Sequence, residues 1–218
     1  MSDGPMREAQ DLRQSIAALS PEKRALLERR LLAMEANPTP AAGIPRREAA
    51  GPCPLSFAQQ RLWILDQLDP GRAMYNVPRA MRLEGPLDLD ALRRALDAIV
   101  ARHETLRTTF HAADGEPVQR IGEAGPVELP VVDLSGRPEG IGEEETRRVL
   151  AEEAQRPFDL TRDLMLRALV IRRGPAEHVL LVVLHHIVAD GWSVGVLYHE
   201  IAALYRAFTR GEPSPLRP

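Results

Sequence analysis

The residues best suited to chemistry lie in one short stretch, residues 185–193, which read HHIVADGWS. Adjacent side chains of an extended chain point in opposite directions, so one histidine of the pair can face a cleft while the other faces the interior. A neutral imidazole can accept a proton from an attacking nucleophile, and its unperturbed pKa of about 6.5 suits neutral pH. We therefore expect His186 to be catalytic and His185 to be structural.

Asp190 and Gly191 follow the histidine pair at a bend before the last predicted helix. A carboxylate in this place can orient an imidazole, or it can hold the loop by pairing with an arginine. Residue types alone leave both roles open. They also leave open a purely structural stretch, because histidine and aspartate at a strand end often serve as hydrogen-bonded packing groups.

Metal-dependent chemistry is disfavoured by the spacing of the candidate ligands. A zinc site needs three or four convergent ligands, and no Cys, Glu or third His stands beside residues 185–190 at ligand spacing. We also expect no Gly-x-Ser-x-Gly nucleophile elbow, no phosphate-cradling glycine-rich loop and no cysteine placed as a nucleophile. We expect no bound metal and no bound cofactor.

The elements on either side must position these residues. The most apolar run of the chain, Val179 to Leu184, directly precedes the histidines and predicts a central strand buried on both faces. Apolar residues at helical spacing from Leu197 to Phe208 then predict a helix that stops toward Gly211.

The rest of the main domain mixes helices and strands, so we expect an α+β fold with a mixed sheet and flanking helices. The pattern predicts helices at about residues 56–68, around Leu92 to Val100 and at 143–155, strands at 77–83 and 165–171, and a hairpin over 108–121 with Asp114-Gly115 at its turn.

Two groups of residues in these elements favour structural roles. Phe57, Leu62 and Trp63 occur at helical spacing, which is typical of side chains that pack in a core. The second group, at a predicted helix end, favours a solvated structural position and comprises Arg102, His103, Glu104 and Arg107.

The N-terminal part is predicted to be a separate unit. Apolar residues recur at helical spacing on both sides of Ser20-Pro21, which predicts a hairpin of two amphipathic helices within residues 1–36. Residues 37–53 are crowded with Pro, Ala and Gly, which is typical of a linker. We expect the main domain to span residues 54–218.

Composition disfavours several classes of protein. The 218 residues carry a net charge of -3 with both signs interspersed, so we expect no nucleic-acid partner. Cys53 is the single cysteine, so no internal disulfide can form. The N-terminus is too polar for a signal peptide, and no apolar run approaches the roughly 20 residues that span a bilayer. We expect a cytoplasmic protein without a membrane partner.

Three segments together resemble the motifs of condensation domains of nonribosomal peptide synthetases. SFAQQRLWIL at residues 56–65 resembles the first motif, RHETLRTTF at 102–110 the second, and HHIVADGWS at 185–193 the HHxxxDG signature. They stand in the family's order and at suitable distances. The resemblance covers about residues 54–218, including PFDL at 157–160.

The resemblance implies a chloramphenicol acetyltransferase-like fold, in which two similar lobes form a V with the HHxxxDG loop at the floor of a tunnel. Donor and acceptor carrier proteins dock at opposite mouths and deliver substrates on phosphopantetheine thioesters. The acceptor's amine attacks the donor's thioester carbonyl to form an amide. Only the first three motifs occur before Pro218. We therefore expect an N-terminal lobe that lacks its C-terminal lobe and is nearly inactive alone.

The resemblance also implies residue roles. His186 would serve the attack, either as a general base or by positioning the amine, and the motif leaves both open. Asp190 matches a family aspartate that pairs with an arginine, and Arg61 of the first motif is the matching partner.

The remaining residues of the signature are weaker candidates. Gly191 would keep the loop close to the thioester, and Trp192 and Ser193 are candidate substrate-channel residues. Both histidines of the pair are intact, which disfavours a heterocyclising relative, and the first motif disfavours an epimerase. Two alternatives stay open: a non-catalytic docking or scaffold fragment of a synthetase, and a coenzyme A-dependent acyltransferase of the same superfamily.

Overall fold

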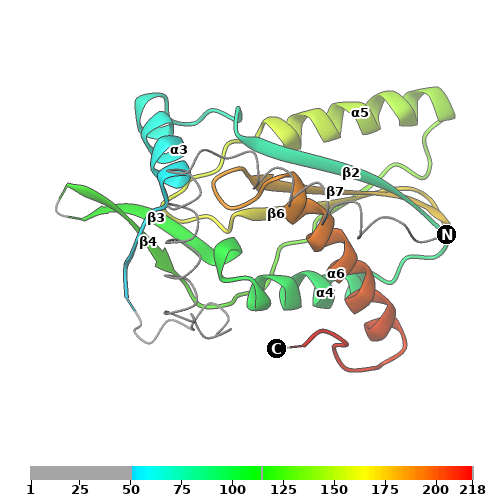
Figure 1. The fold of residues 1–218 in the computed structure, drawn as a ribbon. Helices are drawn as coiled ribbons and strands as arrows, with labels where there is room; N and C mark the ends of the chain where they lie inside the picture. Colours follow the sequence, from blue (N-terminus) through cyan, green and yellow to red (C-terminus); the bar gives the residue numbers. More distant parts are fainter. Residues whose placement is uncertain (1–50, 114, 218) are drawn as a thin grey trace, which may run out of the picture. The chain divides into compact units, whose positions relative to one another are not determined.

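The computed structural model describes residues 51–113 and 115–217. The predicted helical hairpin within residues 1–36, and the predicted linker up to residue 50, lie outside the described residues. In the described part, helices and strands alternate along the chain around a mixed sheet, which confirms the expected α+β class (Figure 1). No helix of this part is long and apolar enough to cross a membrane.

A four-stranded sheet in the order β2-β7-β6-β5 forms the centre of the fold. β7 (Glu177–His185) pairs antiparallel with β2 (Asn76–Glu84) and with β6 (Leu166–Gly174). The short β5 (Val131–Asp133) pairs parallel with β6. Every residue of β7 after Glu177 is buried, which confirms the predicted central strand.

The two faces of this sheet contact two separate hydrophobic cores, because successive side chains of a strand alternate between faces. On one face, α4 (Leu89–Arg102) and α6 (Gly191–Thr209) lie side by side (Figure 1). They pack against Leu166, Ala168, Val170, Leu180, Val182 and Leu184. On the other face, residues of α5 (Glu139–Gln155) and of the segment that follows it pack against Leu169, Ile171, Leu181 and Val183.

A smaller sheet in the order β1-β4-β3 contains the predicted hairpin. β3 (Thr108–Ala113) and β4 (Glu116–Ile121) pair antiparallel, and Gly115 in their turn has a φ of 84°, a conformation that favours glycine. β1 (Cys53–Pro54) pairs with β4. Cys53, which was assigned to the linker, is therefore already part of a sheet.

The helix α3 (Phe57–Leu68) begins where the sequence predicts it, at a capping box formed by Ser56 and Gln59. Leu62 and Trp63 pack against the second core, but Phe57 is 92% exposed. The expected core role of Phe57 is therefore wrong. α3 contains no fully buried residue.

Candidate functional site

The chemistry-bearing loop begins where β7 ends, at His185. The backbone N–H of His186 donates to the carbonyl of Tyr75 at 2.8 Å, and the N–H of Val188 donates to the carbonyl of His185 at 3.1 Å. These bonds continue the pairing of β2 with β7 for one residue and then close a tight turn. The turn fixes the direction in which each histidine leaves the strand.

His185 lies in the interior and is 3% exposed. The rings of Phe158 and Tyr75 meet its imidazole edge-on, with centroids at 5.8 Å and 6.3 Å. Its Nδ1 accepts a hydrogen bond from the N–H of Ile187 at 3.1 Å. Burial, followed by the neighbouring charges of His186 and Arg167, lowers the pKa of His185 to about 4. His185 is therefore neutral at physiological pH, in the state that can accept this bond.

His186 points the other way and is exposed at the edge of a pocket of about 730 Å³. Its Nδ1 lies 2.6 Å from the carbonyl oxygen of Ala189. A carbonyl oxygen can only accept, so Nδ1 carries the proton of the neutral ring. The lone pair is then on Nε2, which has no hydrogen-bond partner within the described residues. His186 can therefore offer a proton acceptor to a bound substrate.

The same pocket brings together all three segments that the sequence analysis singles out. The first segment contributes Ser56, Gln59 and Arg61, the second contributes Thr105, and the third contributes the loop from His186 to Asp190 together with Ser193. Tyr75, which the sequence analysis missed, also lines it. Ser56 and Ser193, which are 137 positions apart in the chain, thus line one cavity.

The carboxylate of Asp190 caps the start of α6 and forms no ion pair with an arginine in the described residues. Its carboxylate accepts from the N–H of Ser193 at 2.8 Å and from the Ser193 hydroxyl at 2.7 Å. The bonds from Ser193 keep the pKa of Asp190 below its usual value. No ion pair joins Asp190 to Arg61 in the described part of the chain, although both line the pocket. The structure thus gives Asp190 the role of a helix cap, through its Oδ1 atom, in place of the expected pair.

The other residues of the signature have different surroundings. Trp192 is 84% exposed and lines a smaller adjoining pocket of about 190 Å³, which Ser193 also lines. A Cβ added to Gly191 would contact nothing within 4 Å. No neighbour in the described chain therefore requires glycine there, and the residue leaves free space beside the loop.

Residues 191–195 read GWSVG and match the Gly-x-Ser-x-Gly pattern of serine hydrolases, so the expectation that the chain lacks this pattern is wrong. Ser193 lies inside the first turn of α6, where its hydroxyl donates to Asp190 and accepts from the Asp190 N–H. No histidine is hydrogen-bonded to this hydroxyl in the described residues. Ser193 is therefore a capping residue and not an activated nucleophile.

The second segment is joined to α6 by a charged cluster that sequence reasoning missed. Arg102 Nε lies 3.1 Å from one carboxylate oxygen of Glu200, and His103 Nε2 lies 2.5 Å from the other. Burial raises the pKa of Glu200, but the hydrogen bonds and charges of His103 and Arg102 outweigh it and leave the pKa below its usual value. Arg102 and His103 therefore stand at a partly solvated helix end, as expected, and they are also partners of a buried carboxylate.

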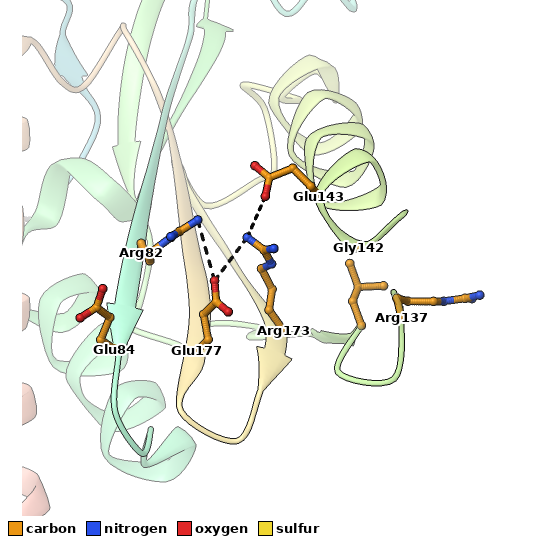
Figure 2. Close-up of a pocket in the computed structure, with 8 residues that line it drawn as sticks. Arg82, Glu84, Arg137, Gly142, Glu143, Arg173 and Glu177 are labelled. Atoms are coloured by element: carbon orange, nitrogen blue, oxygen red, sulfur yellow. Dashed lines mark ion pairs between the residues drawn. The ribbon is translucent and has the colours of Figure 1, made fainter. Parts of the chain in front are cut away.

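A different pocket, of about 440 Å³, lies at the opposite end of the sheet, where Glu84 pairs with Glu177 (Figure 2). Arg173 binds Glu143 at 3.2 Å and Glu177 at 3.3 Å across it. These charges neutralise one another, and the lining contains no histidine, serine or cysteine. This pocket offers no group for acyl transfer.

Within residues 51–113 and 115–217, no group of three or more His, Cys, Asp or Glu side chains could hold a metal ion. The group that the pocket offers for proton transfer is the imidazole of His186. Its Nε2 can take a proton from an amine, or hold the amine by a hydrogen bond, while the amine attacks a carbonyl carbon.

Comparisons with known proteins match the same segments. The condensation domain family profile matches residues 49–218. Phosphinothricin tripeptide synthetase PhsC of Streptomyces viridochromogenes is 46% identical over 210 residues, which cover 96% of this chain and 19% of that protein. Chondramide synthase cmdD of Chondromyces crocatus is 48% identical over 163 residues, which cover 75% of this chain and 4% of that protein.

Comparison with solved structures also gives condensation domains. The starter condensation domain of rhizomide synthetase RzmA has a TM-score of 0.71 at 25% identity, over 77% of this chain and 40% of that one. The first condensation domain of the CDA synthetase has a TM-score of 0.69 at 30% identity, over 78% of this chain and 44% of that one. The expected chloramphenicol acetyltransferase-like fold is confirmed, and the chain belongs to the condensation domain family.

Proposed function

We propose that the chain supplies the His186-bearing lobe of a peptide-bond-forming condensation domain of a nonribosomal peptide synthetase. One observation carries the proposal: the three family motifs meet in a pocket in which the unprotonated Nε2 of His186 is left without a partner from the described chain. The matched part of the chain covers 19% and 4% of the lengths of the two synthetases named above, and under half of the lengths of the two solved condensation domains named above. The activity therefore belongs to a larger assembly.

In this assembly, the amine of the acceptor attacks the carbonyl carbon of the donor thioester. A carbon–nitrogen bond forms, the carbon–sulfur bond breaks, and the amine proton passes to the departing thiolate. His186 Nε2 acts at the attack, where it accepts a hydrogen bond or the proton itself from the amine. Both roles need Nδ1 to be the protonated nitrogen, which the Ala189 carbonyl ensures.

The partners follow from the same proposal. Two carrier proteins bring the donor and the acceptor on phosphopantetheine arms, and a second lobe completes the cavity. Enclosure matters because an open pocket cannot exclude water or hold two reactants at attack distance. The chain itself needs no metal and no resident cofactor for this chemistry.

The experiment is a condensation assay with the complete domain that contains this chain and with carriers loaded with donor and acceptor. His186→Ala is compared with the wild type and with His199→Ala, a change at an exposed histidine on α6. We expect product from the wild type and the control only. Product from the His186 variant at the wild-type rate would refute the proposal. Turnover of a free acyl-coenzyme A, but not of loaded carriers, would instead favour a coenzyme A-dependent acyltransferase.

A further inference from the structure

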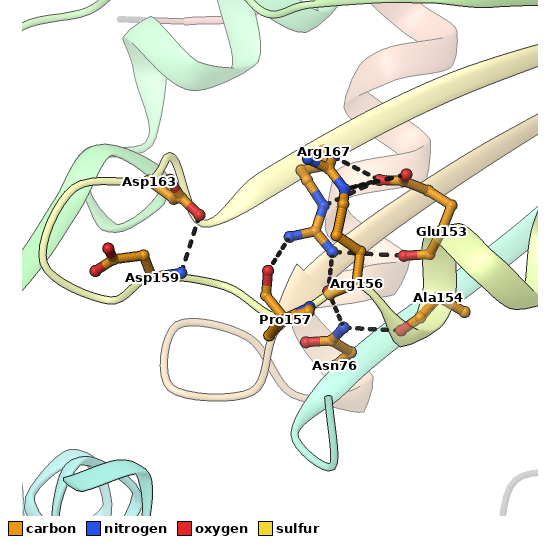
Figure 3. Close-up of polar contacts among 8 residues, drawn as sticks. All are labelled: Asn76, Glu153, Ala154, Arg156, Pro157, Asp159, Asp163 and Arg167. Carbon is orange, nitrogen blue, oxygen red and sulfur yellow. Dashed lines mark hydrogen bonds and ion pairs between the residues drawn. The ribbon is translucent and has the colours of Figure 1, made fainter. Parts of the chain in front are cut away.

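The C-terminal end of α5 is held by two side chains that come from the central sheet (Figure 3). Asn76 Nδ2 donates to the carbonyls of Ala154 at 2.7 Å and Arg156 at 2.8 Å. Arg167 donates to the carbonyls of Arg156 at 2.5 Å and Pro157 at 3.1 Å. The last carbonyls of a helix lack partners within the helix, so these donors satisfy them, and the guanidinium charge suits the negative end of the helix dipole.

Arg167 is the less expected of the two. It is a charged residue in a strand whose neighbours are almost all buried, and its side chain is 11% exposed. Its Nε lies 3.0 Å from a carboxylate oxygen of Glu153. It can be tolerated there because each of its three guanidinium nitrogens donates to an acceptor.

The guanidinium of Arg167 also connects α5 to the histidine pair. Its carbon Cζ lies 3.8 Å from the centroid of the Phe158 ring, and the edge of that ring meets His185. Arg167 pairs with Val183 in the sheet, and Asn76 pairs with His185. By the alternation of a strand, Arg167, Asn76 and His185 therefore face the same side of the sheet.

His185 in turn sets the loop that carries His186. Its Nδ1 can accept the Ile187 N–H only while the ring is neutral. Burial and the nearby charges of His186 and Arg167 lower the pKa of His185 and so maintain that state. The turn that follows aims the Nδ1–H of His186 at Ala189.

We propose that Arg167 is a positioning residue for His186, which it holds through Phe158 and His185 while it anchors the end of α5. The role assigned to His186 rests on the proposed function, but the coupling from Arg167 to the imidazole of His186 does not. This coupling can be measured on the chain without any substrate. Failure of the coupling and failure of the condensation assay are thus separate results.

The test is NMR of the full 218-residue chain with labelled histidine and labelled backbone amides. Arg167→Met keeps an apolar stem and removes the charge and the donors. The matched control is Arg148→Met, since Arg148 binds two glutamates on the exposed side of α5 and touches no ring. We expect the Arg167 variant to raise the pKa of His185 above about 4, because one of the charges that lower it is removed while the burial remains. We also expect it to lower the Nδ1–H population of His186 and to speed exchange of the Ile187 amide by roughly tenfold. The control should leave all three at their wild-type values.

A second variant guards against a loss of folding in the first. Phe158→Leu removes the ring between Arg167 and His185 and leaves the bonds of Arg167 to α5 in place. We expect the same changes at His186 and Ile187, with the amides of α5 unchanged. A folded Arg167→Met or Phe158→Leu chain with the wild-type His186 tautomer and Ile187 exchange rate would overturn the proposal.

Discussion

The Nδ1 atom of His186 lies 2.6 Å from the carbonyl oxygen of Ala189, three residues further along the same loop. This contact assigns the proton of the neutral ring to Nδ1 and leaves Nε2 as the acceptor, because a carbonyl has no proton to give. The loop thus selects one of two tautomers before any substrate binds. A local backbone contact performs the orienting task for which a carboxylate is often used.

The first prediction concerns His186 itself. In the complete condensation domain, His186→Ala should lower the rate of amide formation by about 10² to 10⁴, because a positioned proton acceptor is lost. The folded state should be unaffected, since the side chain is exposed and its one polar contact is with a loop carbonyl. Rates with loaded carriers and melting curves measure the two effects. A large loss of stability would mean that the residue holds the fold instead.

The second prediction is a pH dependence of stability that comes from His185. In the unfolded chain this imidazole binds a proton below its ordinary pKa of 6.5, whereas in the folded chain it does so only near 4. Between these values the unfolded state holds more protons, so the free energy of unfolding decreases as pH falls. The loss from this group should reach about 3 kcal/mol at pH 4. Urea denaturation across a pH series measures it.

The variant that checks this assignment is His185→Asn, whose amide oxygen can take the place of Nδ1 as the acceptor for the Ile187 N–H. Its stability should lose the dependence on pH between 6.5 and about 4. His199→Asn on the exposed side of α6 should retain it. An unchanged slope in the His185 variant would assign the pH dependence to other groups.

The third prediction separates Asp190 from Arg61. Asp190→Ala should cost about 0.5 to 2 kcal/mol of unfolding free energy, since α6 loses its N-cap, and Asp190→Ser should restore most of it. Arg61→Ala should change stability by less than about 0.5 kcal/mol, because the side chain is exposed and forms no ion pair in the described structure. The two losses should add in a double-mutant cycle. A coupling energy above about 1 kcal/mol would show that the two side chains interact after all.

The sequence predicts well what depends on local pattern. The apolar run of β7, the buried face of α4 and the Asp-Gly turn all appear where periodicity and turn chemistry predict them. The three-residue β5 was missed, because it is too short to show a period. The cap at Asp190 could have been predicted from Asp190 and Ser193 three residues apart, a spacing typical of helix starts.

What the sequence could not predict are contacts between distant segments. His103 and Glu200 meet across 97 positions, and neither stands in a local pattern that indicates its partner. Arg167 did carry a signal, because a charge inside an apolar strand must find acceptors, but nothing local indicates that these are the end carbonyls of α5. Which residues share the pocket follows from the sheet order, which the motifs alone do not give.

The fourth prediction concerns the buried cluster at Glu200. Glu200→Gln should lower the free energy of unfolding by about 1 to 3 kcal/mol, because charge-assisted bonds to Arg102 and His103 are replaced by weaker ones. Glu212→Gln, an exposed change just beyond α6, is the control and should be neutral. The losses of unfolding free energy in Glu200→Gln and His103→Ala should not add, since both variants weaken the same contact. Additive losses would place the stabilising role of Glu200 elsewhere.

The last prediction follows from apolar side chains that the described chain leaves uncovered. Phe57 and Leu68 on α3 are 92% and 76% exposed, and Trp192 at the start of α6 is 84% exposed. Burial of large apolar side chains against a partner is favourable, and in the proposed assembly a second lobe is available to cover them. The purified 218-residue chain should therefore associate with itself as its concentration rises. Light scattering over a dilution series measures the mass of the particles in solution. The double variant Phe57→Ser, Trp192→Ser should shift the chain toward monomer. The control variant Arg148→Ser on α5 should leave the association unchanged. A chain that stays monomeric at every concentration would show that these side chains need no cover, and the argument that a partner lobe covers them would fail.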